Sequence, residues 1–181
     1  MSAVHERHDV LPATADQTTG LRPFARYTFA VLRFLLAFQF LWAFFDKTFG
    51  LGRATPAENA WLEGGSPTTG YLSNVGGPFA DLFSAMAGNA VFDWLFMLGL
   101  LGIGTALALG IGMRIAAVSG ALLLVLMWMA SLPLDNNPFV DDHLINAVVL
   151  VALAAVSAGS TWGLGRWWAS LPVVKSNPIL L

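Results

Sequence analysis

Residues 91–132, VFDWLFMLGLLGIGTALALGIGMRIAAVSGALLLVLMWMASL, decide the fold of this chain. They hold two apolar runs, Val91–Ile111 and Ile115–Leu132, with Arg114 in the short turn between them. A helix that crosses a membrane needs about 20 mainly apolar residues. We therefore expect two membrane-spanning helices that lie side by side and are joined by a tight turn.

Two further apolar runs complete the pattern, Tyr27–Phe45 and Leu144–Ala158, and the second reaches spanning length only with its flanking residues. The whole chain is 56% hydrophobic and 11% charged, whereas soluble domains carry about 25% charged residues. A soluble four-helix bundle would also need polar outer faces, and none of the four runs has one. The sequence predicts an all-α integral membrane four-helix bundle.

The rest of the chain divides around this bundle. Residues 1–22 are expected to form a disordered cytoplasmic tail, residues 23–170 the four-helix transmembrane domain, and residues 171–181 a C-terminal cytoplasmic tail. The long connection between the first two runs predicts short outer-side helices, one starting at Thr55–Pro56 and one at Pro78. Gly102, Ala106 and Gly110 form a small-residue stripe that predicts a packing seam, either internal or between protomers.

The basic residues near the helix ends predict the orientation. Arg22, Arg26, Arg114, Arg166 and Lys175 fall on one side of the bundle. Cytoplasmic loops carry the excess of Lys and Arg. We expect a multi-pass protein of the plasma membrane with both termini in the cytoplasm.

Two classes of function are excluded by composition. The formal net charge is only −2, and no basic stretch is interleaved with aromatic residues, so nucleic-acid binding is not expected. The chain has no cysteine, which excludes disulfides, thiolate metal sites and CxxC redox chemistry.

The first helix carries polar side chains on two faces. Arg33, Phe40 and Lys47 follow one another at seven-residue steps on one face, and Gln39 and Asp46 share a second face. An ionisable group within a membrane span is costly and therefore a candidate for function. For Arg33 two interpretations stay open: a side chain that snorkels to the headgroups, and a buried functional group.

The strongest local cluster is NNPFVDDH, residues 136–143, which leads into the fourth helix. Asp141 or Asp142 is placed to cap that helix, and His143 and Asn146 lie within its first turns. The structural interpretation is a capped helix end. The functional interpretation brings these groups into one cavity on the outer side, together with Asp46, Lys47 and Asp93.

Such a cavity is suited to a quinone. An imidazole beside a carboxylate can hydrogen-bond a quinone carbonyl and pass a proton, and Phe40, Trp42, Phe44 and Phe45 would form an apolar wall. A metal site is not favoured, because His143 is the one histidine near the membrane and the carboxylates follow no ligand pattern. With one histidine near the membrane, a single chain also lacks the two axial histidine ligands of a membrane cytochrome b. No covalently bound cofactor is expected, so electrons would have to pass from a substrate or partner to the quinone, menaquinone for example.

Three segments resemble the DoxX family, most closely its actinobacterial branch: RFLLAFQFLWAFFDK (33–47), NNPFVDDHLINAVVLVALA (136–154) and TWGLGRWW (161–168). The resemblance covers about residues 23–168 and implies a compact four-helix membrane bundle. It also implies a relation to DoxD, the membrane subunit of thiosulfate:quinone oxidoreductase, and to membrane complexes that counter oxidative and thiol stress. Matched residue by residue, the family pattern points to Arg33, Lys47, Asp142 and His143.

The first functional prediction is a quinone-interacting subunit of a membrane oxidoreductase that works with a protein partner or as a homo-oligomer. Asp142 and His143 would relay protons, Arg33 or Lys47 would attract an anionic substrate or semiquinone, and the substrate site would include Gln39, Asp46, Asp141 and Asn146. The alternative is a non-catalytic membrane anchor or assembly subunit of a larger complex. A transporter is the third reading, although inverted repeats and interrupted helices are not evident.

Overall fold

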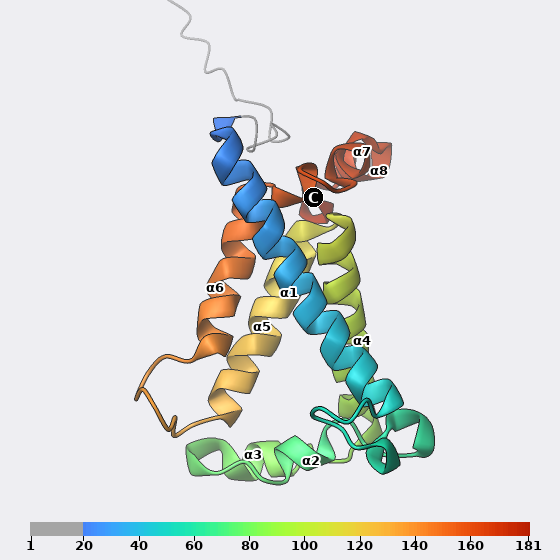
Figure 1. The fold of residues 1–181 in the computed structure, drawn as a ribbon, viewed down its shortest axis with the longest axis vertical. Helices are drawn as coiled ribbons and strands as arrows, with labels where there is room; N and C mark the ends of the chain where they lie inside the picture. Colours follow the sequence, from blue (N-terminus) through green and yellow to red (C-terminus); the bar gives the residue numbers. More distant parts are fainter. Residues whose placement is uncertain (1–19) are drawn as a thin grey trace, which may run out of the picture.

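The computed structural model describes residues 20–181, and the regular elements in this range are all helical. Four long helices stand side by side (Figure 1): α1 (Pro23–Phe49), α4 (Ala90–Leu109), α5 (Met113–Ala130) and α6 (Asp142–Ala155). The connections and the C-terminal region contain the short helices α2 (Thr69–Leu72), α3 (Ala80–Ser84), α7 (Gly165–Ser170) and α8 (Pro172–Ser176), and the 3₁₀ turns η2 (Ala57–Asn59), η3 (Trp61–Glu63), η4 (Gly77–Phe79), η5 (Ala158–Ser160) and η6 (Pro178–Leu180). The predicted all-α fold class is confirmed.

Three of the four long helices are long and apolar enough to cross a membrane: α1, α4 and α5. The fourth, α6, has 14 residues and is therefore about 21 Å long, shorter than a hydrocarbon core of about 30 Å. It ends before Ser157, whose φ of 51° leaves the helical region. The structure thus has three candidate spans, and the span predicted to reach Ala158 stays a prediction.

The outward faces of these helices are apolar. Phe38 of α1 is 65% exposed, Val118 of α5 is 71% exposed and Val148 of α6 is 65% exposed. Large side chains of this kind on every side of a bundle are unfavourable in water, whereas lipid solvates them. Together with the three candidate spans, they indicate a lipid membrane environment.

Close contacts are made at glycines, and the predicted stripe is divided between close contact and open space: a Cβ atom at Gly110 would lie 2.7 Å from the carbonyl oxygen of Gly159. A side chain at Gly102 would meet open space, so this residue does not lie at an internal seam. A Cβ atom at Gly104 would instead lie 2.7 Å from Cγ of Leu41, and one at Gly120 would lie 2.6 Å from Cδ1 of Leu150. The contacts between α1 and α4, and between α5 and α6, therefore depend on glycines that four-residue spacing from Gly110 does not select.

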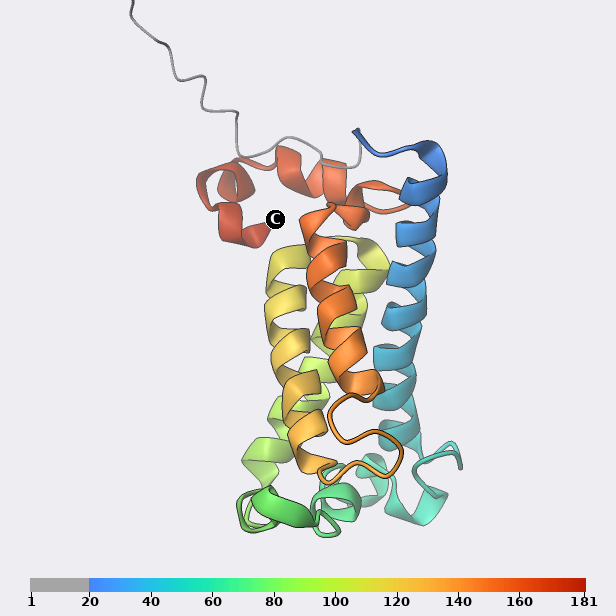
Figure 2. The same ribbon diagram turned by 90° about the vertical axis from the view of Figure 1, so that its left-hand side faces the viewer.

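The connection between α1 and α4 covers one end of the bundle, as Figures 1 and 2 show. Phe83 of α3 is buried, and the Tyr71 hydroxyl lies 2.8 Å from Oγ of Ser131 at the end of α5. The short outer-side helices were predicted, but the first is split into η2 and η3, and Thr55 does not cap it with its side chain. The segment therefore packs on the bundle as a cap.

Charge separates the two ends of the bundle. We call the end with Arg22, Arg26, Arg114, Arg166 and Lys175 the basic end, and the opposite end the acidic end. The acidic end holds the eight acidic residues of the described range: Asp46, Glu58, Glu63, Asp81, Asp93, Asp135, Asp141 and Asp142. The start of α1 and the C-terminal residues both lie at the basic end (Figure 1).

Of the two predicted tails, the structure describes the C-terminal one. Most of the N-terminal tail, residues 1–19, lies outside the described residues. The C-terminal residues 171–181 fold back as α8 and η6, and the Arg114 N–H donates a 2.6 Å hydrogen bond to the Leu181 carbonyl. This segment therefore packs against the start of α5 rather than extending from the bundle.

Candidate functional site

Asp141 begins the site by capping α6. Its extended backbone (φ −127°, ψ −175°) precedes the helix, and its Oδ1 accepts a 3.0 Å hydrogen bond from the Leu144 N–H. A carboxylate at this position satisfies a free N–H group and complements the helix dipole. Of the two aspartates that the sequence offered as caps, the structure selects Asp141.

The second oxygen of Asp141 holds His143. Nδ1 of the imidazole lies 2.7 Å from Oδ2 of Asp141. Because an ionised carboxylate only accepts, Nδ1 carries the proton, and the second ring nitrogen, Nε2, is left for another partner. Burial alone would raise the pKa of Asp141, but hydrogen bonds from His143 and Leu144 and the charge of the imidazolium outweigh it, so that the pKa lies below its ordinary value. The pair therefore fixes both the orientation and the tautomer of the ring.

A pair of amide side chains continues the polar surface from α6 to α1. Nδ2 of Asn146 on α6 lies 3.5 Å from Oε1 of Gln39 on α1, at the outer limit of a hydrogen bond. Asn146 follows His143 by three residues and so lies on the same side of α6. We call Gln39, Asp141, His143 and Asn146 the polar strip. The structure brings together these four predicted site residues.

Asp142 lies at the edge of this strip. Its side chain is 76% exposed, and Oδ1 is 3.8 Å from Nδ1 of His143. The ligand atoms of Asp141, Asp142 and His143 lie within 4.8 Å of one another. Both oxygens of Asp141 are already used by Leu144 and His143. The arrangement is therefore that of a helix cap with an oriented imidazole, not of three ligands directed at one ion.

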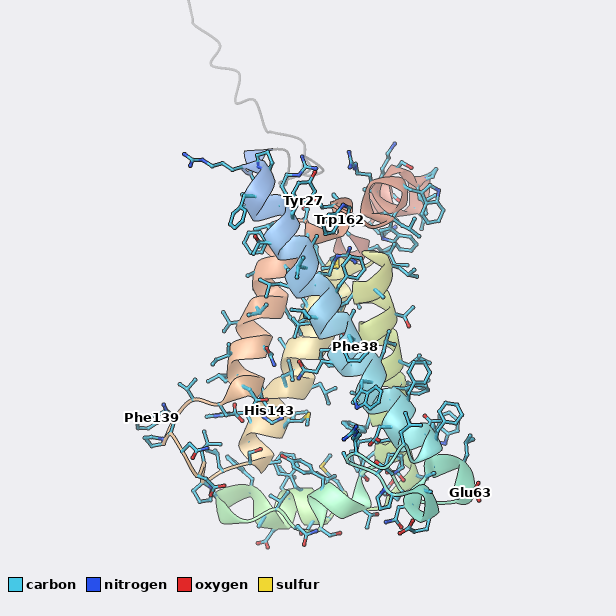
Figure 3. All side chains as sticks on the ribbon, in the orientation of Figure 1. Tyr27, Phe38, Glu63, Phe139, His143 and Trp162 are labelled. Atoms are coloured by element: carbon cyan, nitrogen blue, oxygen red, sulfur yellow. The ribbon has the colours of Figure 1, made fainter. Side chains whose placement is uncertain are left out.

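Arg33 lies far from this strip, towards the basic end. It is fully buried, and its guanidinium donates to four main-chain carbonyls: Leu107 and Ala108 at the end of α4, and Thr161 and Trp162 after η5. Figure 3 shows Tyr27 and Trp162, whose rings stack 5.0 Å apart, at the opposite end from His143. Of the two interpretations of Arg33, the structure shows burial rather than snorkelling, with both terminal nitrogens of the guanidinium bonded to backbone carbonyls.

Asp46 and Asp93 are at the acidic end but hold the connection in place. The carboxylate of Asp46 accepts hydrogen bonds from the N–H groups of Arg53 and Ala54. Oδ1 of Asp93 accepts from the Thr68 N–H and from two hydroxyls, those of Ser66 and Thr68. Both carboxylates are buried by these partners. They are not brought to His143.

The predicted aromatic wall is divided between two environments. Phe40 is 4% exposed and belongs to the core, whereas Trp42 is 39% exposed and stacks on Phe38 with ring centroids 5.8 Å apart. Phe44 packs against the core and is partly buried. Nζ of Lys47 lies 5.8 Å from the ring centroid of Phe96 on α4. These side chains therefore lie in the core, on the exposed face of α1 and beside α4, and do not form one wall.

Comparison with known proteins adds no further constraint. No protein-family model, curated protein or solved structure matches the chain. The resemblance to the DoxX family therefore stays a prediction.

Sequence reasoning missed two features of the structure. The first is that the guanidinium of Arg33 bonds both to the end of α4 and to Trp162, 129 residues further along the chain, which no local pattern reveals. The second is a cavity at the basic end, where the three cations Arg114, Arg166 and Lys175 come together. The sequence signal for the cavity was present, because the distribution of basic residues near the helix ends predicts that Arg114, Arg166 and Lys175 lie on one side of the bundle.

Proposed function

We propose that this protein is a DoxX-like, quinone-interacting subunit of a membrane oxidoreductase. In this proposal it is a multi-pass protein of the plasma membrane with both termini in the cytoplasm, and α6 with its flanking residues provides the fourth span. The observation that carries the proposal is the polar strip: an imidazole oriented by Asp141, one turn from an amide pair that joins α6 to α1.

The chemistry of the strip suits a quinone head group. A quinone presents two carbonyl oxygens on an apolar ring, so it needs hydrogen-bond donors within an apolar surface. Nε2 of His143 donates when the ring is protonated, and the amide groups of Asn146 and Gln39 each donate from nitrogen. The neighbouring outward side chains Ile145 and Val148 are exposed and apolar, which gives a lipid-soluble ligand access from the bilayer.

Proton transfer follows from the same geometry. Reduction of a quinone to a quinol takes two electrons and two protons; the electrons come from a thiol or thiosulfate donor that a partner subunit oxidises. His143 supplies one proton: its Nε2–H bond breaks as an O–H bond forms at the quinone oxygen. Asp141 stabilises the imidazolium before transfer, and water reached through the exposed Asp142 restores the proton and supplies the second.

The test is quinone binding to the purified full-length protein, measured by titration with a menaquinone analogue that quenches tryptophan fluorescence. We expect saturable binding that weakens about tenfold or more in His143→Ala and in Asn146→Leu, because each removes a hydrogen-bond donor to the quinone. His8→Ala is the matched control, since it removes a histidine outside the strip. Binding by the wild-type protein that neither substitution weakens would contradict the assignment of the strip.

A membrane anchor or assembly subunit is the second candidate, and one observation favours it. Arg33, Asp46 and Asp93, the buried ionisable residues of the described range, all form hydrogen bonds with groups that hold the fold together. An anchor would bind no quinone while folded, and His143→Ala would leave capture of its partner unchanged. The fluorescence titration and a partner pull-down with the same variant therefore separate the two functions.

A further inference from the structure

A cavity of about 1240 Å³ opens at the basic end of the bundle. It lies between α5, α6 and the C-terminal segment, which overhangs the start of α5 in Figure 2. The indole N–H of Trp168 donates a 2.6 Å hydrogen bond to the Leu180 carbonyl and holds α7 to η6. Pockets for small molecules measure about 300–1,000 Å³. The volume therefore suits a larger ligand, at the opposite end from the polar strip.

Three cations line this cavity: Arg114, Arg166 and Lys175. Within residues 20–181 none of them forms a salt bridge, and the acidic residues of that range are at the other end of the bundle. Arg114 donates one hydrogen bond to the Pro178 carbonyl, and Arg166 donates one to the Ser160 carbonyl. A guanidinium has five N–H donors. Most of the donors around the cavity are thus available to an anion.

The cavity continues into the apolar part of the bundle. Arg114, Val118 and Leu122 follow at four-residue steps on one face of α5, so this face reaches about 12 Å from the cation into the span. Val118 and Leu122 are 71% and 60% exposed, and Val151 of α6, which also lines the cavity, is 54% exposed. The site therefore joins a cationic rim to an apolar groove along α5 and α6.

We propose that this cavity binds an anionic glycerophospholipid. Its phosphate lies among Arg114, Arg166 and Lys175, and an acyl chain lies along Val118, Leu122 and Val151. Cationic groups at a membrane surface attract acidic lipids, and guanidinium groups match phosphate geometry. A free phosphate would leave the apolar groove empty, and a zwitterionic lipid such as phosphatidylcholine would bring a quaternary ammonium group that the three cations repel. The charge and the groove together therefore select a lipid that has both parts.

The experiment is native mass spectrometry of the full chain in detergent, titrated with phosphatidylglycerol and with phosphatidylcholine of the same acyl chains. We expect phosphatidylglycerol to bind about tenfold or more tightly than phosphatidylcholine, and the triple variant R114Q/R166Q/K175Q to lose this preference. The control R22Q/R26Q/R53Q removes the same charge outside the cavity and should keep it. Thermal unfolding confirms that each variant is folded.

Two further arms separate the parts of the ligand. Ala155→Trp fills the groove without changing charge and should weaken phosphatidylglycerol binding, which keeps the proposal testable if the triple variant does not fold. Glycerol 3-phosphate should compete poorly, because it lacks the acyl chain. Equal binding of both lipids, an equal loss in the control variant, or full competition by glycerol 3-phosphate would overturn the proposal.

Discussion

Arg33 of α1 donates a 3.0 Å hydrogen bond to the main-chain carbonyl of Trp162, 129 residues further along the chain. The same guanidinium reaches Ala108 at the end of α4 at 2.9 Å. The last carbonyls of a helix have no partner within it, and in lipid each unsatisfied carbonyl is costly. One buried cation therefore satisfies two chain segments at once and joins α1, α4 and the segment after η5.

Replacing Arg33 should destabilise the protein strongly. Arg33→Leu leaves carbonyls of α4 and of the segment at Thr161 and Trp162 without donors, and we expect a loss of about 3–5 kcal/mol. Arg33→Lys keeps the charge but offers fewer donors, so its loss should be smaller. Unfolding in detergent, followed by circular dichroism, measures both. Arg22→Leu at the exposed start of α1 is the control, and equal stability of the two leucine variants would refute this role.

The two glycines of α4 should respond differently to the same substitution. Gly104→Val places a side chain against Leu41 and should cost about 1–3 kcal/mol, as overpacking does, whereas Gly102→Val enters open space. Comparison of the two melting temperatures measures the difference. Chemical cross-linking of the two variants shows whether the oligomeric state changes. If Gly102→Val is the more damaging variant, or if it changes the oligomers that are cross-linked, the stripe of Gly102, Ala106 and Gly110 is a seam between protomers and α4 packs differently.

The fold was predictable to the extent that it follows from local pattern. Apolar run length gave α1, α4 and α5, and Asp141 could be named as a cap candidate because capping depends on residue type and position. The packing seam could not be placed, because Gly102 and Gly104 differ only in which side of α4 meets Leu41. A single sequence does not show how α4 is rotated about its own axis relative to α1.

The candidate site divides in the same way. His143, Asp141 and Asn146 are neighbours in sequence, so their grouping follows from helix geometry, and Gln39 joined them from a face already identified as polar. Asp46 and Asp93 lie at the same end of the bundle as these residues but have different partners. Their partners come from the connection between α1 and α4, whose path the sequence did not predict.

Stability should depend on pH through Asp141. The folded protein lowers the pKa of this carboxyl below its unfolded value of about 3.9. The contribution is therefore present above about pH 4 and is lost as the pH falls through the folded pKa. The variant Asp141→Asn should be less stable than wild type at pH 6. It should lose less stability than wild type when the pH is lowered to 3. Melting curves at both values test this, with Asp135→Asn as the control; identical pH dependence in all three proteins would argue against the ion pair.

The cap over the acidic end should loosen when Asp93 is replaced. Oδ1 of Asp93 gathers three donors from Ser66 and Thr68, so Asp93→Ala leaves buried polar groups of the connection unpaired. We expect faster hydrogen exchange in residues 65–89 and little change in the middle of α5, because local opening exposes only the segment that has lost its partner. Asp81→Ala removes an exposed carboxylate from the same segment and should leave exchange unchanged. If exchange rises equally in the two variants, the segment is held by apolar contacts such as that of Phe83, and the carboxylate of Asp93 is not what fixes it.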